Sequence, residues 1–171
     1  MKTILAVLLI AASPAAARAQ ADQAPPGEAA AERATAEIER RADSAAMQIE
    51  AEAFMASYAD ELRAGNRAAI AARYDRRGAW RLGHGEKSFE RWPAIRDFYA
   101  GPEWQPPASF EWRDLSFEPA GPDAVVVAGL FRWGSGGGGE PRTYSYTALL
   151  VRRDGELRIR LEDESGRPAG R

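Results

Sequence analysis

The sequence predicts an α+β fold, with helices in the first half of the domain and a curved antiparallel sheet of long strands in the second. Apolar residues recur at helical spacing from Met47 to Leu62, which predicts one long amphipathic helix. After residue 108, four segments carry the apolar and β-branched pattern of strands. Asp154 and Gly155 form a strong two-residue hairpin signal between the last two of these segments.

The N-terminal segment predicts export. Residues 1–19 combine a basic start at Lys2, an apolar run over residues 4–12 and the Ala17-Arg18-Ala19 cleavage pattern, which together are typical of a secretory signal peptide. A retained membrane anchor is the alternative, but the apolar run is much shorter than the roughly 20 residues that cross a bilayer. We therefore expect a periplasmic or secreted protein without an integral membrane span after cleavage.

Charge and cysteine content exclude several classes of function. Without residues 1–19, which carry Lys2 and Arg18 and no acidic residue, the formal net charge falls from −2 to −4. A nucleic-acid-binding protein would carry a basic face instead, so no nucleic acid partner is expected. The chain has no cysteine, which excludes disulfides, thiolate catalysis and zinc sites built on cysteine.

Composition divides the chain into segments. Residues 20–27 hold two prolines and a glycine and predict a linker. Residues 28–46 are rich in Ala, Glu and Arg and predict an exposed helical segment, because Ile38 is their only large apolar residue. The compact domain is expected over residues 47–165, and residues 166–171 are expected to be a flexible tail.

Within that domain the pattern predicts three helices and five strands. The long helix ends at Gly65, and shorter helices are expected over residues 67–74 and 91–101. A brief strand is expected at residues 79–83. The four later strands are expected at residues 109–118, 124–133, 142–153 and 156–164.

The first of the four long strands changes its apolar phase. Phe110 and Trp112 share one parity, whereas Leu115 and Phe117 share the other. A β-bulge near Asp114 would bring all four side chains to one face and bend the strand. Partial burial of both faces explains the same pattern, and the sequence leaves these two alternatives open.

The order of these elements and three local stretches resemble the nuclear transport factor 2-like superfamily. The stretches are "FMASYADELRAGNRAAIAARYDRRGAWRLG" (54–83), "AIRDFYAG" (94–101) and "YTALLVRRDGELRIRLEDES" (146–165). SnoaL-like proteins and secreted domains of unknown function are the most similar branches. The resemblance implies a cystatin-like roll, in which a cone-shaped sheet wraps the helices and leaves a pocket at its open end. It also implies homodimers through the outer sheet face.

The superfamily includes isomerases, cyclases, dehydratases, non-catalytic binding modules and assembly proteins. In the ketosteroid isomerases the general base is an aspartate at the end of the first strand. The matching position here is Leu82, which cannot abstract a proton, so isomerase activity of that type is not expected. His84, the only histidine, is a candidate general acid or base, and an exposed turn residue is the alternative.

Asp163 is the second catalytic candidate. By alternation it shares a row with Leu157, Ile159 and Leu161, which we expect to face inward. The superfamily often carries a histidine at this point of the last strand. A carboxylate inside the pocket could serve as an acid, a base or a ligand anchor, and a solvated strand end is the alternative.

Four aromatic residues are predicted to line the pocket and bind a ligand: Tyr58, Trp80, Trp112 and Tyr146. The predicted function is an exported, non-catalytic module that binds a small apolar or amphipathic molecule. One alternative is a SnoaL-like cyclase, isomerase or hydrolase that uses Asp163. Another is an assembly protein that uses the outer sheet face. No cofactor and no metal ion are expected, and the chain is expected to form a homodimer.

Overall fold

The computed structural model describes residues 26–83 and 85–166. The elements follow the order α1 (Pro26–Ala64), α2 (Arg67–Ala72), β1 (Ala79–Gly83), β2 (Glu86–Glu90), α3 (Trp92–Ala100), β3 (Ser109–Pro119), β4 (Ala124–Gly134), β5 (Arg142–Arg153) and β6 (Glu156–Gly166). The strands form one sheet in the order β2-β1-β6-β5-β4-β3. The fold class is therefore α+β, as the sequence predicts.

The long helix starts earlier than predicted. Helix α1 begins at Pro26, inside the expected linker, because the fixed φ of proline suits the first turn of a helix. It runs without a break through residues 28–46, which are mostly exposed, into the stripe that starts at Met47. By its contacts the chain divides into two compact units, one that ends at Arg40 and one that begins at Arg41.

Two predicted segments cannot be compared with the structure. Residues 1–19, the predicted signal peptide, lie outside the described residues, as does the tail from residue 167 onward. Within residues 26–83 and 85–166, no helix is both long and apolar enough to cross a membrane.

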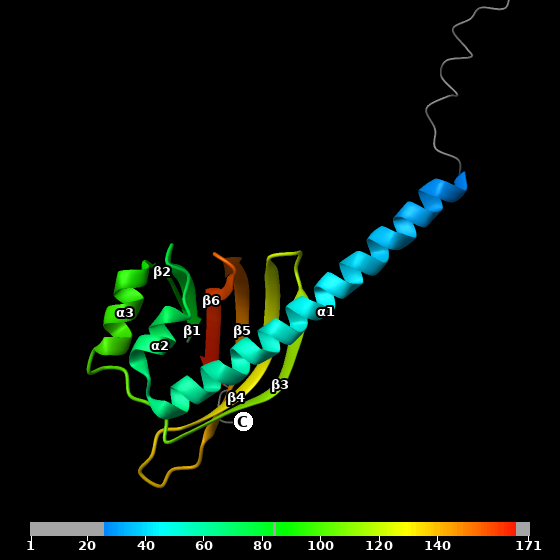
Figure 1. Cartoon of the computed structure of the whole chain (residues 1–171). Coiled ribbons are helices and arrows are strands. Elements are labelled where there is room, and N and C mark those ends of the chain that lie inside the picture. The colour runs from blue at the N-terminus through cyan, green and yellow to red at the C-terminus, as the bar shows by residue number, and fades with distance from the viewer. Residues whose placement is uncertain (1–25, 84, 167–171) are drawn as a thin grey trace, which may run out of the picture. The chain divides into compact units, whose positions relative to one another are not determined.

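The unit from Arg41 onward contains the sheet and its helices. The second half of α1 lies across the concave side of the sheet, and α2 and α3 lie near β1 and β2 (Figure 1). The predicted stripe of α1 is buried at Met47, Ala51, Met55, Tyr58 and Leu62. Each large apolar side chain that is fully buried stabilises the fold by about 1.5–3 kcal/mol.

The sheet is mixed, whereas the sequence predicts an antiparallel one. Strand β1 runs parallel to β6, with Trp80 opposite Leu161. The cause lies just before β1, where the backbone N–H of Asp75 donates to the carbonyl of Ile159, and the N–H of Ile159 donates to the carbonyl of Arg73. These bonds align the chain with β6, and β1 continues in the same direction.

The bulge considered for β3 is present. The pairing with β4 shifts between Arg113 and Ser116, and Asp114 has a φ of 51°. Trp112, Leu115 and Phe117 all pack against the core, as a bulge predicts. A side chain at Gly129 on β4 would place its Cβ 2.9 Å from the carbonyl oxygen of Asp114, so the bulge requires glycine there.

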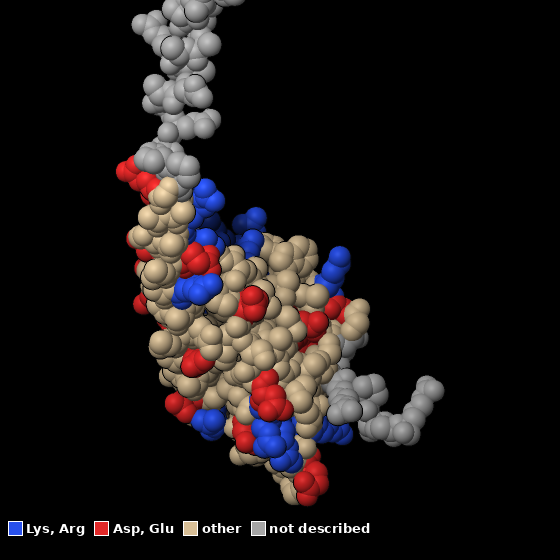
Figure 2. Space-filling model, turned by 90° about the vertical axis from the view of Figure 1, so that its right-hand side faces the viewer, with Lys and Arg blue, Asp and Glu red and all other residues tan. Residues whose placement is uncertain are grey.

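Strand β2 was not predicted. Its residues, Glu86 to Glu90, are polar and mostly exposed because β2 is the edge of the sheet and has one neighbouring strand. On the face in Figure 2, acidic and basic side chains are interspersed among a larger uncharged area. That face carries no extended field of one sign.

Candidate functional site

A second bulge, in β6, builds the candidate site. Leu149 of β5 pairs with Leu161 and Leu150 pairs with Ile159, so Arg160 has no partner on β5. The guanidinium of Arg160 instead donates to the carbonyl of Gly78 over 2.5 Å. The expectation that Leu161 and Asp163 continue the inward row is therefore wrong, because the extra residue reverses the parity. Glu162, 3% exposed, is buried in their place.

Buried phenols surround the Glu162 carboxylate. The hydroxyl of Tyr74 donates to Oε2 through a very short bond. The hydroxyls of Tyr146 and Tyr58 lie 3.2 and 3.4 Å from Oε1. Tyr99 extends the cluster, because its hydroxyl lies 2.7 Å from that of Tyr74 and can donate to it.

Burial and charge oppose each other at this carboxylate. Burial raises the pKa of Glu162, while the phenol hydrogen bonds and the nearby Arg81 work against the rise. Burial, together with the Glu162 carboxylate, also raises the pKa of Tyr58, Tyr74 and Tyr146. The phenols therefore stay protonated and act as donors at neutral pH.

Glu164 lies two residues further along β6, on the same side as Glu162. Burial raises its pKa to about 8, and the Glu162 charge adds to the rise, whereas Arg81 opposes it. No hydrogen bond or ion pair joins its carboxyl to another residue in the described part of the chain. Glu164 is thus a carboxyl that can change protonation near neutral pH and is available to a ligand.

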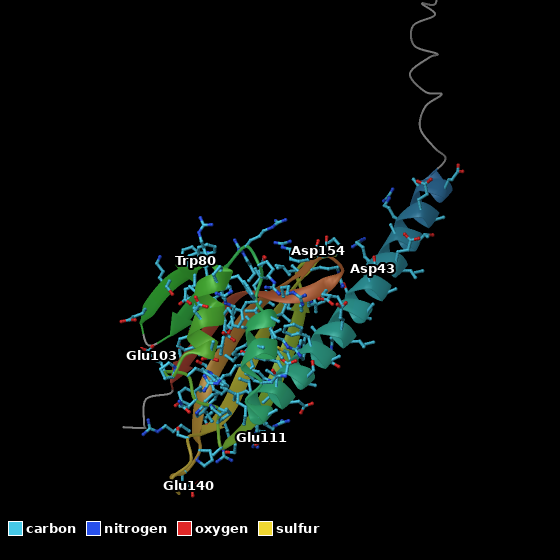
Figure 3. All side chains as sticks on the ribbon, turned by 60° about the vertical axis from the view of Figure 1, so that its left-hand side comes forward. Asp43, Trp80, Glu103, Glu111, Glu140 and Asp154 are labelled. Carbon is cyan, nitrogen blue, oxygen red and sulfur yellow. The ribbon has the colours of Figure 1, made fainter. Side chains whose placement is uncertain are left out.

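A cavity of about 360 Å³ opens beside Glu164. Its walls come from the end of α1, from α3 and the segment after it, and from β1, β4, β5 and β6. Most of the lining is aromatic: Tyr58, Phe98, Tyr99, Trp104, Phe131, Trp133 and Tyr144. The polar lining includes Arg81, Glu103 and Glu164. Figure 3 shows Glu103 at the side of the molecule that carries α3. We call this space the aromatic cavity.

A second cavity, of about 290 Å³, adjoins the same two charged residues. It shares Arg81 and Glu164 with the aromatic cavity, and Glu162 also lines it. The rest of its lining is mainly polar and comes from the β1–β2 hairpin: Leu82, Gly83, Glu86, Lys87, Ser88 and Glu90. We call it the polar cavity. Arg81 and Glu164 therefore stand between an aromatic and a polar space.

A wider groove of about 520 Å³ lies elsewhere, between α1, α2 and the β5–β6 turn. Its basic residues already have partners, since Arg73 is 2.7 Å from Glu61 and Arg158 pairs with Glu156. This groove has no free charge to recognise a ligand, although it is larger. In the described residues, no group of three or more His, Cys, Asp or Glu side chains is placed to hold a metal ion.

Comparisons with known proteins address the fold. No protein-family model matches the chain, and no curated protein matches it. Among solved structures, a nuclear transport factor 2-like protein of unknown function from Shewanella oneidensis matches with a TM-score of 0.61 and 12% identity. The match covers 69% of this chain and 98% of that one. The fold is nuclear transport factor 2-like.

Two further matches share this nuclear transport factor 2-like fold but are named for different functions. One is a provisionally named calcium/calmodulin-dependent protein kinase II association domain from Xanthomonas campestris, with a TM-score of 0.58 and 20% identity over 71% of this chain and 88% of that one. Another is a provisionally named scytalone dehydratase from Novosphingobium aromaticivorans, with a TM-score of 0.57 and 12% identity over 74% and 95%. At these identities the likeness establishes the fold and does not transfer a function.

The structure separates the four predicted ligand-binding aromatics. Tyr58 lines the aromatic cavity. Tyr146 is 1% exposed and donates a hydrogen bond to the Glu162 carboxylate. Trp112 packs against Tyr146 with ring centroids 4.6 Å apart and donates its indole N–H to the carbonyl of Met55, so it supports the site without lining it. Trp80 is 40% exposed and contacts Phe89, outside both cavities. Figure 3 labels it on β1.

Asp163, one of the two predicted catalytic residues, does not reach the cavities. Asp163 accepts a hydrogen bond from the Ser165 hydroxyl at 2.8 Å and lines neither cavity. His84 lies outside the described residues. Leu82, which the sequence resemblance aligns with the base of the ketosteroid isomerases, lines the polar cavity with an aliphatic side chain.

Sequence reasoning missed the residues that make the site. Glu162 and Glu164 were expected to face outward, and Arg81, Tyr74 and Tyr99 were not predicted as site residues. Under strict alternation, the charged residues at positions 160, 162 and 164 share one face of the strand and predict an exposed row. The bulge at Arg160 turns residues 162 and 164 to the opposite face. Arg81 within the short β1 was the available signal, since a long cation beside apolar neighbours needs a buried partner.

Proposed function

We propose that this domain binds a small amphipathic molecule in the aromatic cavity. The observation that carries the proposal is that an aromatic wall and two titratable side chains, Arg81 and Glu164, line the same space. Ligand sites are typically concave, mostly apolar and fitted with a few polar groups that fix orientation. Because roughly 150 Å³ is enough for benzene, about 360 Å³ accommodates a two-ring compound.

Binding without catalysis is the first form of this proposal. Leu82 occupies the position of the isomerase base and has no titratable group. The buried carboxylate of Glu162, which lines the polar cavity, is held by phenols and is not free to move a proton to a substrate without breaking those bonds.

Tryptophan fluorescence tests the proposal, because Trp104 and Trp133 line the cavity. We expect 2-(1-naphthyl)ethanol, a neutral two-ring probe, to change this fluorescence saturably. Trp133→Ala should weaken binding about tenfold or more, since a buried aromatic contact contributes about 1.5–3 kcal/mol. Trp80→Ala is the matched control on the outside of the sheet and should bind as the native protein does. Absence of saturable binding to the native protein would refute the proposal.

A second candidate function is acid–base catalysis by Glu164. The specific observation is a carboxyl with a pKa of about 8 beside a cavity, close to the pH at which a general acid or base works best. This candidate replaces the alternative built on Asp163. Glu164→Gln would abolish turnover of a true substrate, whereas Asp163→Asn would leave it within a few fold.

Export and self-association remain parts of the proposal. Export is supported by the pattern of residues 1–19, and N-terminal sequencing of the mature protein should begin at Gln20.

Homodimerisation is supported by two exposed aromatics on the outside of β1 and β2, Trp80 and Phe89, at 40% and 42% exposure. Exposed aromatic side chains are enriched at interfaces between proteins.

A further inference from the structure

We infer that the ligand is an amphipathic cation, with its aromatic or apolar body in the aromatic cavity and an ammonium group against the Glu164 carboxyl. This inference rests on the proposed binding function and adds the charge of the ligand. It depends on the distribution of charge around Glu164, on the ring faces of the cavity and on the lining of the polar cavity.

The first argument is the balance of charge between the two cavities. The negative charge of Glu162 and the positive charge of Arg81 interact favourably and offset each other. Glu164 adds a second acidic group that has no hydrogen-bond or ion-pair partner among residues 26–83 and 85–166. The Glu162 charge raises the pKa of Glu164 more than Arg81 lowers it, so the potential at this carboxyl is negative. A cation bound there would stabilise the ionised form of Glu164, which burial and the Glu162 charge otherwise disfavour.

The aromatic cavity supplies the second argument. Ring faces attract cations because of their quadrupole. Two rings of the lining already contact a cation. The guanidinium carbon of Arg81 lies 4.5 Å from the centroid of Phe98, and that of Arg67 lies 5.1 Å from the centroid of Trp104. Trp133 and Tyr144 also line the cavity, and no described cation lies over their rings, whereas Phe131 is stacked on Tyr144 and on Phe110. Aromatic walls combined with a carboxylate are suited to an ammonium ion.

The polar cavity supplies the third argument. Its lining contains the carboxyls of Glu86, Glu90, Glu162 and Glu164, against the cations of Arg81 and Lys87. An ammonium group at Glu164 would therefore face further acidic side chains and water on its far side. A carboxylate ligand in the same place would meet the same acidic excess.

Arg81 does not favour an anionic ligand. Its Nη1 lies 3.5 Å from Glu90 Oε2, its charge interacts with the Glu162 carboxylate, and its guanidinium lies over Phe98. Its charge is already used by these neighbours. An anion would have to compete with two fixed carboxylates for it, whereas a cation finds Glu164 unengaged.

Three isosteric probes test the inference by calorimetry: 2-(1-naphthyl)ethylammonium, 2-(1-naphthyl)ethanol and 1-naphthylacetate. We expect the ammonium to bind at least tenfold more tightly than the alcohol, and the carboxylate more weakly than both. Glu164→Gln should remove the advantage of the ammonium while the alcohol still binds, which also shows that the variant keeps its cavity. Glu118→Gln, a distant exposed residue of β3, is the matched charge control and should change nothing.

A second readout needs no variant. At pH 7 most Glu164 carboxyls hold a proton, so binding of the ammonium should release close to one proton, measured in two buffers of different ionisation enthalpy. The alcohol should release none. If the alcohol binds and the ammonium is not favoured, or releases no proton, the inference is overturned and the proposed function stands. If none of the three probes binds, the proposed function itself fails.

Discussion

The Tyr74 hydroxyl links the buried Glu162 carboxylate to the Tyr99 hydroxyl, and its removal should destabilise the fold measurably. Tyr74→Phe deletes the donor to Glu162 Oε2 and the acceptor of the Tyr99 hydroxyl, 2.7 Å away. A hydrogen bond to a charged group contributes about 1.5–3 kcal/mol, and a neutral one about 1 kcal/mol. Because Tyr74 is completely buried, water cannot replace either bond. We expect the free energy of unfolding to fall by about 3 kcal/mol.

Urea denaturation at pH 7, followed by circular dichroism, measures this loss. Tyr58→Phe is the matched control, because the same change is made at the same carboxylate where the hydroxyl is 3.4 Å from Oε1. It should cost about 1 kcal/mol or less. Equal losses in the two variants would refute the conclusion that Tyr74 is the principal donor, as would a loss below about 1 kcal/mol for Tyr74→Phe.

The remaining predictions concern pH dependence, Asp163 and self-association. The pKa of Glu164 is about 8 in the folded protein and 4.5 ordinarily, so its contribution to stability is complete below pH 4.5 and is lost as the pH rises through 8. At 1.36 kcal/mol per pH unit, Glu164→Gln should remove about 2 kcal/mol of the decline in unfolding free energy between pH 6 and pH 8. Asp163→Asn should keep most of the native pH slope in the same urea titrations, because Asp163 faces away from the cavities and its charge is the weakest of those that raise the pKa of Glu164; a flattened slope would contradict this placement. Trp80→Ser should convert the proposed dimer to monomer in native mass spectrometry, and a dimer that persists would exclude this face.

Most of the fold could be predicted from the sequence, because the spacing of the apolar residues and the turn-forming residues indicate the same helices and strands. The stripe from Met47 to Leu62 is the buried side of α1, and β1 has the predicted bounds of residues 79–83. The later strands differ from prediction by two residues at most, and Asp154-Gly155 forms the expected turn. The polar edge strand β2 was missed, because its residues are polar and mostly exposed and so carry no apolar alternation.

The site could not be predicted because it depends on one extra residue in β6. The bulge in β3 left a phase change in the apolar residues around Asp114, so the sequence revealed it as one of two alternatives. The bulge at Arg160 left no such trace, since Leu161 continues the apparent alternation of Leu157 and Ile159, and the residues from 162 to 165 are all charged or polar. The residue that bulges makes a long-range contact, the bond from Arg160 to the carbonyl of Gly78, which no local pattern encodes.

The central claim is that the Glu164 carboxyl faces the cavities, has no hydrogen-bond or ion-pair partner in the described part of the chain, and changes protonation near neutral pH. Carbon-13 NMR of the side-chain carboxyls, with Glu164 assigned through Glu164→Gln, measures this directly. We predict that the Glu164 resonance titrates with a pKa of about 8 and that its titration moves to lower pH when 2-(1-naphthyl)ethylammonium is added. A midpoint near 4.5 that is unaffected by the amine would contradict the account.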